Sequence, residues 1–531
     1  MIPAKFYRDL GLIMWAVGLA LTMQGQTWNE IQKIVASDRG VSQRFSKSVA
    51  ISGDYAIVGA HRNATDAEGN APLEKAGAAY IFRRNADSGQ WQEVQKIVPS
   101  DRAAEDNFGT SVAISGDYVV VGAYKRDEGE NLHQCGAVYL FEKEEDGHWV
   151  EKQKLLASDP DSLDYFGISV GCSQSNLIVG AAYKIDDTTG IIQAGAAYFF
   201  ERNSDGIWEQ TAKVTASDKG NFDLFGYSVA ISGNYAVVGA YKQDKNTSGS
   251  ATLTDAGAAY IFARNGGGQW TEVQKIVASD RSSGDWLGYR VAMDDNHVIL
   301  GAPQKDSHTG AAYIFEPNVD GYWEETGKAV ALDGSPNDEF GIAVAISNHY
   351  ALVGAKMEDE DENASHTLNN AGAAYIFRDD NAPGWAQSQK LVASDRGIGD
   401  WFGFSVAMNG NNAIIGAFGD GENADGGDFL NTAGSAYLFA TDGNALSVEP
   451  SLPPMTIQLS PNPVEGRLYI TPNGLAPFSF RIVDLCGSQL LEQNNLEGGV
   501  SVDLSKYPSG VYVIQIIMAN RFYLSEKILK L

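Results

Sequence analysis

Short runs in which apolar or small residues alternate with polar ones occur along most of this chain, and they predict β-strands. At residues 228–240 two such runs flank Gly233-Asn234, a two-residue turn of the kind that joins paired antiparallel strands. A third run at residues 258–262 and a fourth at residues 270–277 follow after polar segments. The pattern therefore predicts a unit of four antiparallel strands.

This unit recurs seven times, which indicates a repeat protein. The glycine that ends the second strand recurs at Gly59, Gly122, Gly180, Gly239, Gly301, Gly354 and Gly416. The glycine before the third strand recurs at Gly77, Gly136, Gly195, Gly257, Gly310, Gly372 and Gly434. Seven such units predict a β-propeller, in which radial repetition protects most strand edges.

The two ends of the repeat region complement each other. The last unit stops at residue 439 without a fourth strand, whereas residues 28–35 have the pattern of a fourth strand but follow no unit. We therefore expect residues 28–35 to complete the last blade and close the ring.

The N-terminus has the pattern of a secretory signal peptide. Lys5 and Arg8 precede an apolar run at residues 10–23, which is too short and wrongly flanked for a membrane span. We assign residues 1–25 to this signal and expect no transmembrane segment elsewhere.

The rest of the chain divides into a propeller at residues 26–441, a linker at residues 442–455 and a smaller domain at residues 456–531. Six strands are expected in the smaller domain, at residues 456–460, 467–471, 478–484, 500–504, 510–518 and 522–529. Their spacing suits a small sandwich. The predicted fold class is all-β, a seven-bladed β-propeller followed by a small C-terminal β-sandwich.

Charge and cysteine content narrow the classes of partner. The net charge is −28, which disfavours nucleic acid as a partner because counterion release needs a basic surface. Cys135, Cys172 and Cys486 lie in unrelated places, and we interpret them as buried free thiols.

The Phe-Gly pairs and the downstream Val-Gly-Ala elements resemble FG-GAP repeats, the blades of the integrin α-subunit propeller. The pairs are Phe108-Gly109, Phe166-Gly167, Phe225-Gly226, Phe340-Gly341 and Phe402-Gly403, whereas the first copy has Phe45-Ser46. The resemblance implies a propeller with a binding or adhesion role.

The calcium loops of some integrin blades are missing from these hairpins, so the resemblance implies no calcium site here. We expect no cofactor and little dependence of folding on calcium. One acidic run could bind an ion weakly, because carboxylate oxygens at short spacing suit calcium. Its candidate ligands are Asp420, Glu422, Asp425 and Asp428.

The C-terminal segments at residues 460–463, 480–487 and 507–514, with the final Lys-Ile-Leu-Lys-Leu, resemble the type A sorting domain of the type IX secretion system. This resemblance implies a Bacteroidetes-type bacterium and recognition by the type IX secretion machinery. It also implies that the mature protein is secreted, extracellular or attached to the outer cell surface.

Two repeated residues are expected to be structural. A tryptophan opens each fourth strand, at Trp28, Trp91, Trp149, Trp208, Trp270, Trp323 and Trp385. An aspartate of Ala-Ser-Asp recurs in almost every unit, and we expect it to accept hydrogen bonds from backbone amides of the turn into the next blade.

Candidate ligand-binding residues lie at positions where the residue of one blade differs from that of the other blades. The residue before each Phe-Gly varies, and it is aromatic at Tyr165, Trp286 and Trp401. Arg290 stands where five other blades have serine, and it should face the central channel, paired with a neighbouring aspartate. Solvated loops under relaxed selection would also vary, so variation by itself leaves both interpretations open.

A cation follows the Gly-Ala element in six blades. The six are Arg62, Lys125, Lys184, Lys242, Lys305 and Lys356. An acidic residue usually follows closely, which favours local ion pairs. Capture of an anionic ligand on one rim is the alternative.

The sequence contains no phosphate loop, nucleophile elbow or metal-ligand spacing of histidines. We therefore expect a non-catalytic binding or adhesion propeller that recognises an extracellular protein or glycan. The alternative is a secreted polysaccharide-active enzyme, a glycoside hydrolase or lyase on a propeller scaffold.

Overall fold

The computed structural model describes residues 27–174, 176–249, 252–379, 384–441, 457–472, 478–484, 489–496, 499–518 and 521–531. The chain forms two compact units, Met1–Ser447 and Val448–Leu531, and the division falls within the stretch expected to be a linker. The predicted signal peptide, that linker and Cys486 lie outside the described residues.

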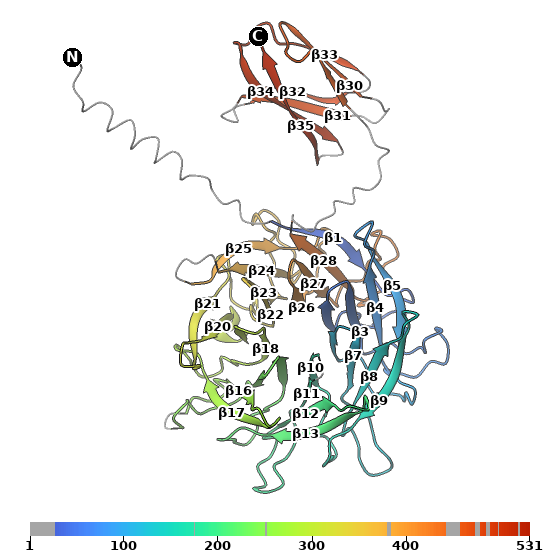
Figure 1. Ribbon diagram of the computed structural model, residues 1–531, viewed down its shortest axis with the longest axis vertical. Coiled ribbons are helices and arrows are strands. Elements are labelled where there is room, and N and C mark those ends of the chain that lie inside the picture. The colour runs from blue at the N-terminus through green and yellow to red at the C-terminus, as the bar shows by residue number, and fades with distance from the viewer. Residues whose placement is uncertain are drawn as a thin grey trace, which may run out of the picture. The chain divides into compact units, whose positions relative to one another are not determined.

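The first unit contains seven four-stranded antiparallel sheets, as the repeat predicts. Figure 1 shows these sheets as blades around a ring, with the first strand of each blade near the centre. These first strands are β2 (Ser48–Ser52), β6 (Ser111–Ser115), β10 (Ser169–Ser173), β14 (Ser228–Ser232), β18 (Arg290–Met293), β22 (Ala343–Ser347) and β26 (Phe402–Asn409).

The second and third strands form the middle of each blade. The second strands are β3 (Tyr55–Ala60), β7 (Tyr118–Ala123), β11 (Asn176–Ala181), β15 (Tyr235–Ala240), β19 (Val298–Ala302), β23 (Tyr350–Ala355) and β27 (Asn412–Ala417). The third strands are β4 (Ala78–Arg84), β8 (Ala137–Lys143), β12 (Ala196–Arg202), β16 (Ala258–Arg264), β20 (Ala311–Pro317), β24 (Ala373–Arg378) and β28 (Ser435–Thr441).

The fourth strands lie at the outer edge. They are β5 (Trp91–Ile97), β9 (Trp149–Leu155), β13 (Trp208–Val214), β17 (Trp270–Ile276), β21 (Trp323–Ala329), β25 (Ala386–Leu391) and β1 (Trp28–Ile34). One short helical turn, α2 (Lys305–His308), lies in the loop of the fifth blade.

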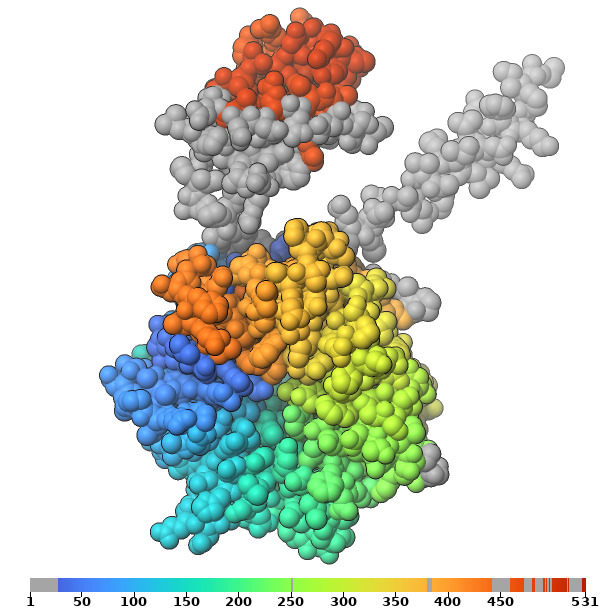
Figure 2. All heavy atoms as spheres, turned by 180° about the vertical axis from the view of Figure 1, so that it is seen from behind, coloured from blue at the N-terminus to red at the C-terminus, as the bar shows by residue number. Residues whose placement is uncertain are grey.

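The ring closes through the N-terminal strand, as expected. β1 pairs antiparallel with β28, from Trp28 opposite Thr441 to Ile34 opposite Ala436. Figure 2 shows the colours following the sequence around the propeller, so that the first and last blades are neighbours. The last blade is therefore built from both ends of the repeat region.

The repeated glycines allow adjacent blades to approach closely. A Cβ atom on Gly59 would lie 2.0 Å from the carbonyl oxygen of Gly109 in the next blade. Gly77 has φ +90°, and a Cβ atom there would lie 2.0 Å from the carbonyl oxygen of Phe108. A side chain at either position would displace backbone, which explains why the sequence repeats glycine there.

The repeated tryptophans pack between blades and are buried, as expected. At five junctions a glutamine side chain of one blade bonds both backbone groups of the next blade's tryptophan. Gln32 accepts from the Trp91 amide and donates to its carbonyl, both at 2.8 Å. The same arrangement joins Gln389 to Trp28 and so stabilises the closed ring.

The aspartate of Ala-Ser-Asp is structural, but its expected partners are wrong. Asp38 accepts hydrogen bonds from the Tyr80 hydroxyl at 2.5 Å and the Lys96 ammonium at 2.7 Å. Asp218 likewise accepts from Tyr260 and Lys275, at 2.6 and 2.7 Å. Side chains of the following blade satisfy this carboxylate, so the element links blades rather than capping a turn.

The second unit contains two small sheets, which agree with the predicted sandwich class. One sheet holds β29 (Ile457–Ser460), β30 (Arg467–Pro472) and β33 (Val500–Asp503), in the order β29-β30-β33. The other holds β32 (Gln489–Leu496), β31 (Phe478–Asp484), β34 (Gly510–Met518) and β35 (Arg521–Lys530), in the order β32-β31-β34-β35. The sequence analysis missed β32, whose centre is a polar Glu-Gln-Asn-Asn run without a clear alternation.

The described residues include two of the three cysteines. Cys135 is a buried free thiol, whereas the free thiol of Cys172 is only half-buried, so that part of the prediction is wrong. No helix in the described part of the chain is long and apolar enough to cross a membrane.

Candidate functional site

A cavity of 630 Å³ lies at the centre of the propeller, where the seven innermost strands begin. Every first strand contributes to its wall, because the residues after each Phe-Gly corner and after several Gly-Ala elements point into it. The repeat supplies serine and valine at most of these positions. The character of the cavity therefore depends on the blades that depart from the repeat.

One side of the cavity is cationic. Arg44, Lys47, His61, Arg62 and Lys125 line it, all from the first two blades and the connections that lead into them. In the described part of the chain none of these cations forms an ion pair, and the Nε atoms of Arg44 and Arg62 are buried without a hydrogen-bond partner. His61 is 6% exposed, and its Nδ1 also has no partner there.

Burial and neighbouring cations lower the pKa values of Lys47 and His61 in this cluster. Desolvation, together with the nearby cations Arg290, Arg44 and Lys356, lowers the pKa of Lys47 to about 7. Desolvation and the cations Lys47, Arg44 and Arg62 hold the pKa of His61 well below its usual value. Positive charge in this cluster is therefore not neutralised by protein carboxylates.

Aromatic faces partly compensate for the missing carboxylates. The Lys47 ammonium lies 4.5 Å from the ring centroid of Phe404, and the Arg44 guanidinium lies 5.4 Å from that of Phe418. The Lys125 ammonium lies 5.6 Å from the ring centroid of Tyr124. Cation–π contacts of this kind stabilise a cation but leave its charge available to an anion.

The other side of the cavity is rich in tyrosine. Tyr165 packs between Tyr124 and Tyr183, with ring centroids 5.2 and 4.8 Å away. Tyr227 lies further round the same wall and packs on Tyr289 at 5.2 Å. The wall therefore presents aromatic faces and hydroxyl groups, and Lys125 over Tyr124 lies beside them.

Arg290 faces the central cavity, as its position on an innermost strand predicts, but the expected aspartate partner is wrong. Its guanidinium donates to the carbonyl of Tyr289 at 3.1 Å and lies over the rings of Tyr227 and Tyr289, at 5.5 and 4.9 Å. No ion pair of Arg290 occurs in the described part of the chain. It therefore adds a further unneutralised cation to the wall.

The six cations after Gly-Ala do not form one rim, because they occupy three different positions. Arg62, Lys125 and Lys242 lie three residues after the glycine, Lys184 and Lys305 four, and Lys356 two. Arg62 and Lys125 line the cavity. Lys242 and Lys356 lie beside it, paired with Asp255 at 4.0 Å and with Glu339 at 2.7 Å.

Lys184 and Lys305 turn into their blades and are buried. Lys305 pairs with Asp285 at 3.0 Å, and Lys184 pairs with Asp164 at 3.1 Å and with Asp161. Local pairing with a following acidic residue is therefore confirmed only in part: Lys184 also lies 3.7 Å from Asp187, whereas the shortest contacts of both lysines are with carboxylates about 20 residues earlier. These two lysines stabilise blades and are unavailable to a ligand.

Trp286 and Trp401 are half-buried and do not line the cavity itself. Trp286 packs on Tyr241 and Tyr289, with ring centroids 5.3 and 6.0 Å away. Trp401 packs on Phe418 at 4.9 Å. Both indoles therefore support aromatic residues next to the cavity, and neither is enclosed between blades.

The acidic run at residues 420–428 is not gathered into one site. Asp420 is 2% exposed and points into the blade, where it pairs with Lys33 at 2.7 Å and accepts from the Tyr437 hydroxyl at 3.0 Å. Asp425 and Asp428 are exposed, and Glu422 is half-buried.

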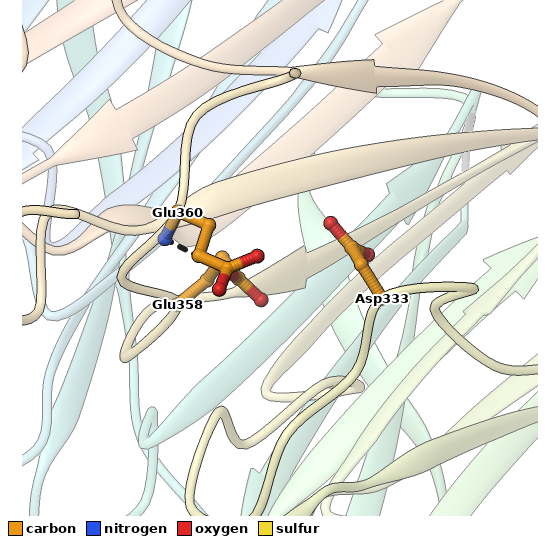
Figure 3. Close-up of side chains that lie close together, drawn as sticks. All are labelled: Asp333, Glu358 and Glu360. Carbon is orange, nitrogen blue, oxygen red and sulfur yellow. Dashed lines mark hydrogen bonds between the residues drawn. The ribbon is translucent and has the colours of Figure 1, made fainter. Parts of the chain in front are cut away.

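Within the described residues, the carboxylates that come close enough to share an ion are Asp333, Glu358 and Glu360. Figure 3 shows these groups facing one another, and the Glu360 amide donates to the Glu358 carboxylate at 2.9 Å. The Lys390 ammonium already lies 2.6 Å from Asp333 and 3.2 Å from Glu358. A lysine thus occupies the place where a metal would neutralise the cluster.

The sequence analysis missed several cavity residues, and one signal would have found them. The second residue after the phenylalanine of each corner, or after Leu287 in the fifth blade, lines the cavity in five of the seven blades. It varies as strongly as the residue before the corner. Aligned across the repeats, it is Lys47, Thr110, Ile168, Tyr227, Tyr289, Ile342 and Phe404. Lys47, Tyr227 and Phe404 would have been chosen from this alignment as departures from the repeat.

These features define a seven-bladed β-propeller with one asymmetric, cationic and aromatic cavity at its centre. The FG-GAP repeat model matches residues 28–82, 91–141, 149–200, 208–262, 270–315, 323–377 and 385–439. The chain belongs to this family, as the Phe-Gly and Val-Gly-Ala elements indicated.

The second unit is also matched to a family. Residues 458–530 match the secretion system C-terminal sorting domain. This domain marks proteins that the type IX secretion system exports and then releases or attaches to the cell surface, so it interacts with that machinery. The protein is therefore secreted.

No curated protein matches the chain. Many solved structures resemble it, among them one bacterial and one yeast protein. A protein of Bacteroides fragilis described as a 6-phosphogluconolactonase is 11% identical, with a TM-score of 0.41 over 66% of this chain and 84% of that one. Sqt1 of Saccharomyces cerevisiae is 9% identical, with a TM-score of 0.39 over 78% of this chain and 99% of that one. Likenesses of this size carry no conclusion about function.

Proposed function

We propose that this protein is a secreted, non-catalytic binding propeller, and that the central cavity is where it holds an extracellular glycan or protein. The carrying observation is the asymmetry of this cavity within a nearly seven-fold scaffold. Residues that build the blades recur, whereas Lys47, Tyr165, Tyr227 and Arg290 each break the repeat and meet in one wall. Departures that converge in space are what a binding site requires.

The experiment compares binding by the wild type with binding by variants that restore the repeat. Arg290→Ser introduces the residue that five other blades carry, and Tyr165→Leu introduces the residue of the fourth blade, so both should fold. Arg83→Gln is the control, because it removes one charge at the opposite end of a blade, beside the hairpin residue Tyr55.

Each protein is passed over arrays of extracellular polysaccharides and matrix proteins. We expect saturable binding by the wild type, weakened about tenfold by Arg290→Ser or Tyr165→Leu and unchanged by Arg83→Gln. Binding that ignores both cavity variants, or the absence of saturable binding across the arrays, would refute the proposal.

A lyase is a second candidate, because one observation favours it. Lys47, with a pKa of about 7, and His61, kept neutral, lie beside guanidinium groups. Proton abstraction next to a carboxylate needs a base of this strength and cations that neutralise the carboxylate. A hydrolase is less well supported, since Glu105 is the only carboxylate among the described residues that line the cavity, and it pairs with Lys75 at 2.8 Å.

The same polysaccharide panel separates binding from catalysis. Unsaturated products that accumulate with time together with new reducing ends, and that disappear in Lys47→Ile, would identify a lyase. Bound polysaccharide of unchanged length would support the non-catalytic proposal.

A further inference from the structure

The cations in the central cavity differ from those elsewhere in the propeller. The chain carries 67 acidic and 39 basic residues, so carboxylates are abundant. Cations that serve the blades use them: Lys96 pairs with Asp38 at 2.7 Å, and Lys275 pairs with Asp218 at the same distance. Among the described residues that line the cavity, Lys75 pairs with Glu105, the one lining carboxylate, at 2.8 Å, whereas Arg44, Lys47, Arg62, Lys125 and Arg290 make no ion pair.

An unneutralised cluster of this kind is costly for the free protein. Arg44, Lys47, Arg62 and Arg290 repel one another, and desolvation adds to the cost. The lowered pKa of Lys47 has these two causes. An anion placed among them would remove the repulsion and provide acceptors for the buried Nε groups of Arg44 and Arg62.

The tyrosine-rich part of the wall favours a sugar as the carrier of this anion. The rings of Tyr165 and Tyr183 and the ring of Tyr227 border the cavity, and aromatic faces pack well against the C–H faces of sugar rings. Their hydroxyl groups donate to and accept from sugar hydroxyls. The volume of 630 Å³ lies within the range of about 300–1,000 Å³ that is typical of small-ligand sites.

We propose that the central cavity binds an acidic saccharide, with its carboxylate or sulfate group on Arg44, Lys47 and Arg62 and its sugar face on the tyrosine wall. This inference rests on the proposed function, because it assumes that this cavity is the binding site. Arginine clusters also recognise acidic peptides, so the cations alone do not select the ligand; the aromatic faces and hydroxyls of the tyrosines favour the saccharide, and a peptide is an outcome of the test.

The probes are a galacturonate oligosaccharide, a chondroitin sulfate oligosaccharide of similar length and the methyl ester of the first, which has the same rings without charge. Binding is measured by titration calorimetry at pH 6, where Lys47 is protonated. We expect one or both acidic probes to bind and the ester to bind at least about tenfold more weakly. Chondroitin sulfate carries both a carboxylate and a sulfate, so tighter binding of this probe than of the galacturonate oligosaccharide shows that the sulfate group adds to the contact.

The variants again follow the repeat. Lys47→Ile introduces the residue of the third and sixth blades, and Arg62→Gln keeps a hydrogen-bonding side chain without the charge. Each should weaken the acidic probes about 10- to 100-fold, whereas the matched charge removal Arg83→Gln should change affinity less than about twofold. Equal losses in all three variants would show a general charge effect and overturn the proposal.

Two further probes test the saccharide part. Tyr227→Ile, which again introduces a residue of other blades, should weaken binding of the acidic oligosaccharide but leave binding of inorganic sulfate unchanged. Tighter binding of a hexaglutamate peptide, or binding of inorganic sulfate as tight as that of the oligosaccharide, would overturn the assignment to a saccharide. If the methyl ester or a protein binds at this cavity and the acidic probes do not, the inference fails while the proposed function stands.

Discussion

In this propeller the role of a side chain depends on the exact position in the repeat at which one blade differs from the others. Lys184 and Lys125 look equivalent in sequence, yet one residue of offset turns Lys184 into the blade and leaves Lys125 in the cavity wall. The aspartate two residues before the Phe-Gly corner of the fourth blade, Asp223, is also turned into the blade. It is 3% exposed and accepts a hydrogen bond from the Gln243 side chain at 2.6 Å. Burial and partner therefore determine function more directly than residue type.

Asp223 should make the stability of the fourth blade depend on pH. Burial raises the pKa of Asp223 to about 6, above its unfolded value. The folded state thus binds more protons, so the stabilisation is complete below about pH 4 and is lost as the pH rises through 6. Asp223→Asn should remove a pH dependence worth at most about 3 kcal/mol, measured as the difference in unfolding free energy from the wild type between pH 4 and pH 8. A constant difference over that range would show that Asp223 is already ionised in the folded protein.

Trp286 and Trp401 should contribute to binding more than to folding. Each is half-buried against rings that border the cavity, so truncation to alanine should cost less than the roughly 3–5 kcal/mol of a fully buried tryptophan. We expect Trp286→Ala and Trp401→Ala to remain folded and to weaken adhesion to the recognised surface. Trp91→Ala, at a fully buried junction, is the comparison that should destabilise strongly. Unaltered adhesion in both Trp286→Ala and Trp401→Ala would show that these indoles serve local packing only.

At the scale of the strand, β1 makes the ring a closed structure. Its Trp28 is 1% exposed, its backbone pairs along β28, and its Lys33 neutralises two carboxylates, Asp395 and Asp420, at 2.6 and 2.7 Å. Deleting residues 26–36 would expose the edge of β28 and leave both carboxylates without their cation. A chain that starts after residue 36 should lose much of its cooperative stability, and a melting temperature within a degree or two of the parent would contradict the closure.

Lys33→Met tests the same strand without shortening it. It should cost about 3–5 kcal/mol, because two carboxylates in the interior of the blade lose their shared cation. Lys96→Met is the matched control: both lysine side chains are 6% exposed, but Lys96 faces the single carboxylate of Asp38. Thermal unfolding at one scan rate should therefore show a larger decrease in melting temperature for Lys33→Met than for Lys96→Met. Equal losses would mean that Asp420 bears no charge that Lys33 must neutralise.

At the scale of the whole molecule, a nearly repeated scaffold carries one site that is not repeated. The blades are joined by recurring tryptophan and aspartate contacts, with glutamine at five junctions, so the residues that line the cavity can change without altering these joints. The sorting domain is a separate compact unit with its own small sheets. The sorting domain and the proposed binding cavity therefore belong to different compact units of the chain.

Folding of the propeller should need little calcium. The carboxylates of Asp333 and Glu358 already pair with Lys390, and Asp420 pairs with Lys33. Adding a chelator should shift the melting temperature by less than about 2 °C, whereas a loss of about 10 °C would reveal a tightly held ion. Lys390→Met removes the ammonium from the first cluster and is the control that should gain stability when calcium is added.

The sequence by itself determined the blades, the number of strands in each and the closure of the ring. The period-two alternation and the paired glycines are local signals, and each recurs in seven blades. The strand at residues 28–35, which follows no unit of its own, indicated how the ring closes. Only the tertiary structure decided which cations are free. Lys305 finds Asp285 in a preceding loop, and Arg44 and Arg290, far apart in sequence, come to lie in one cavity. Charge neutralisation depends on distances across blades, and no spacing within one repeat encodes those distances.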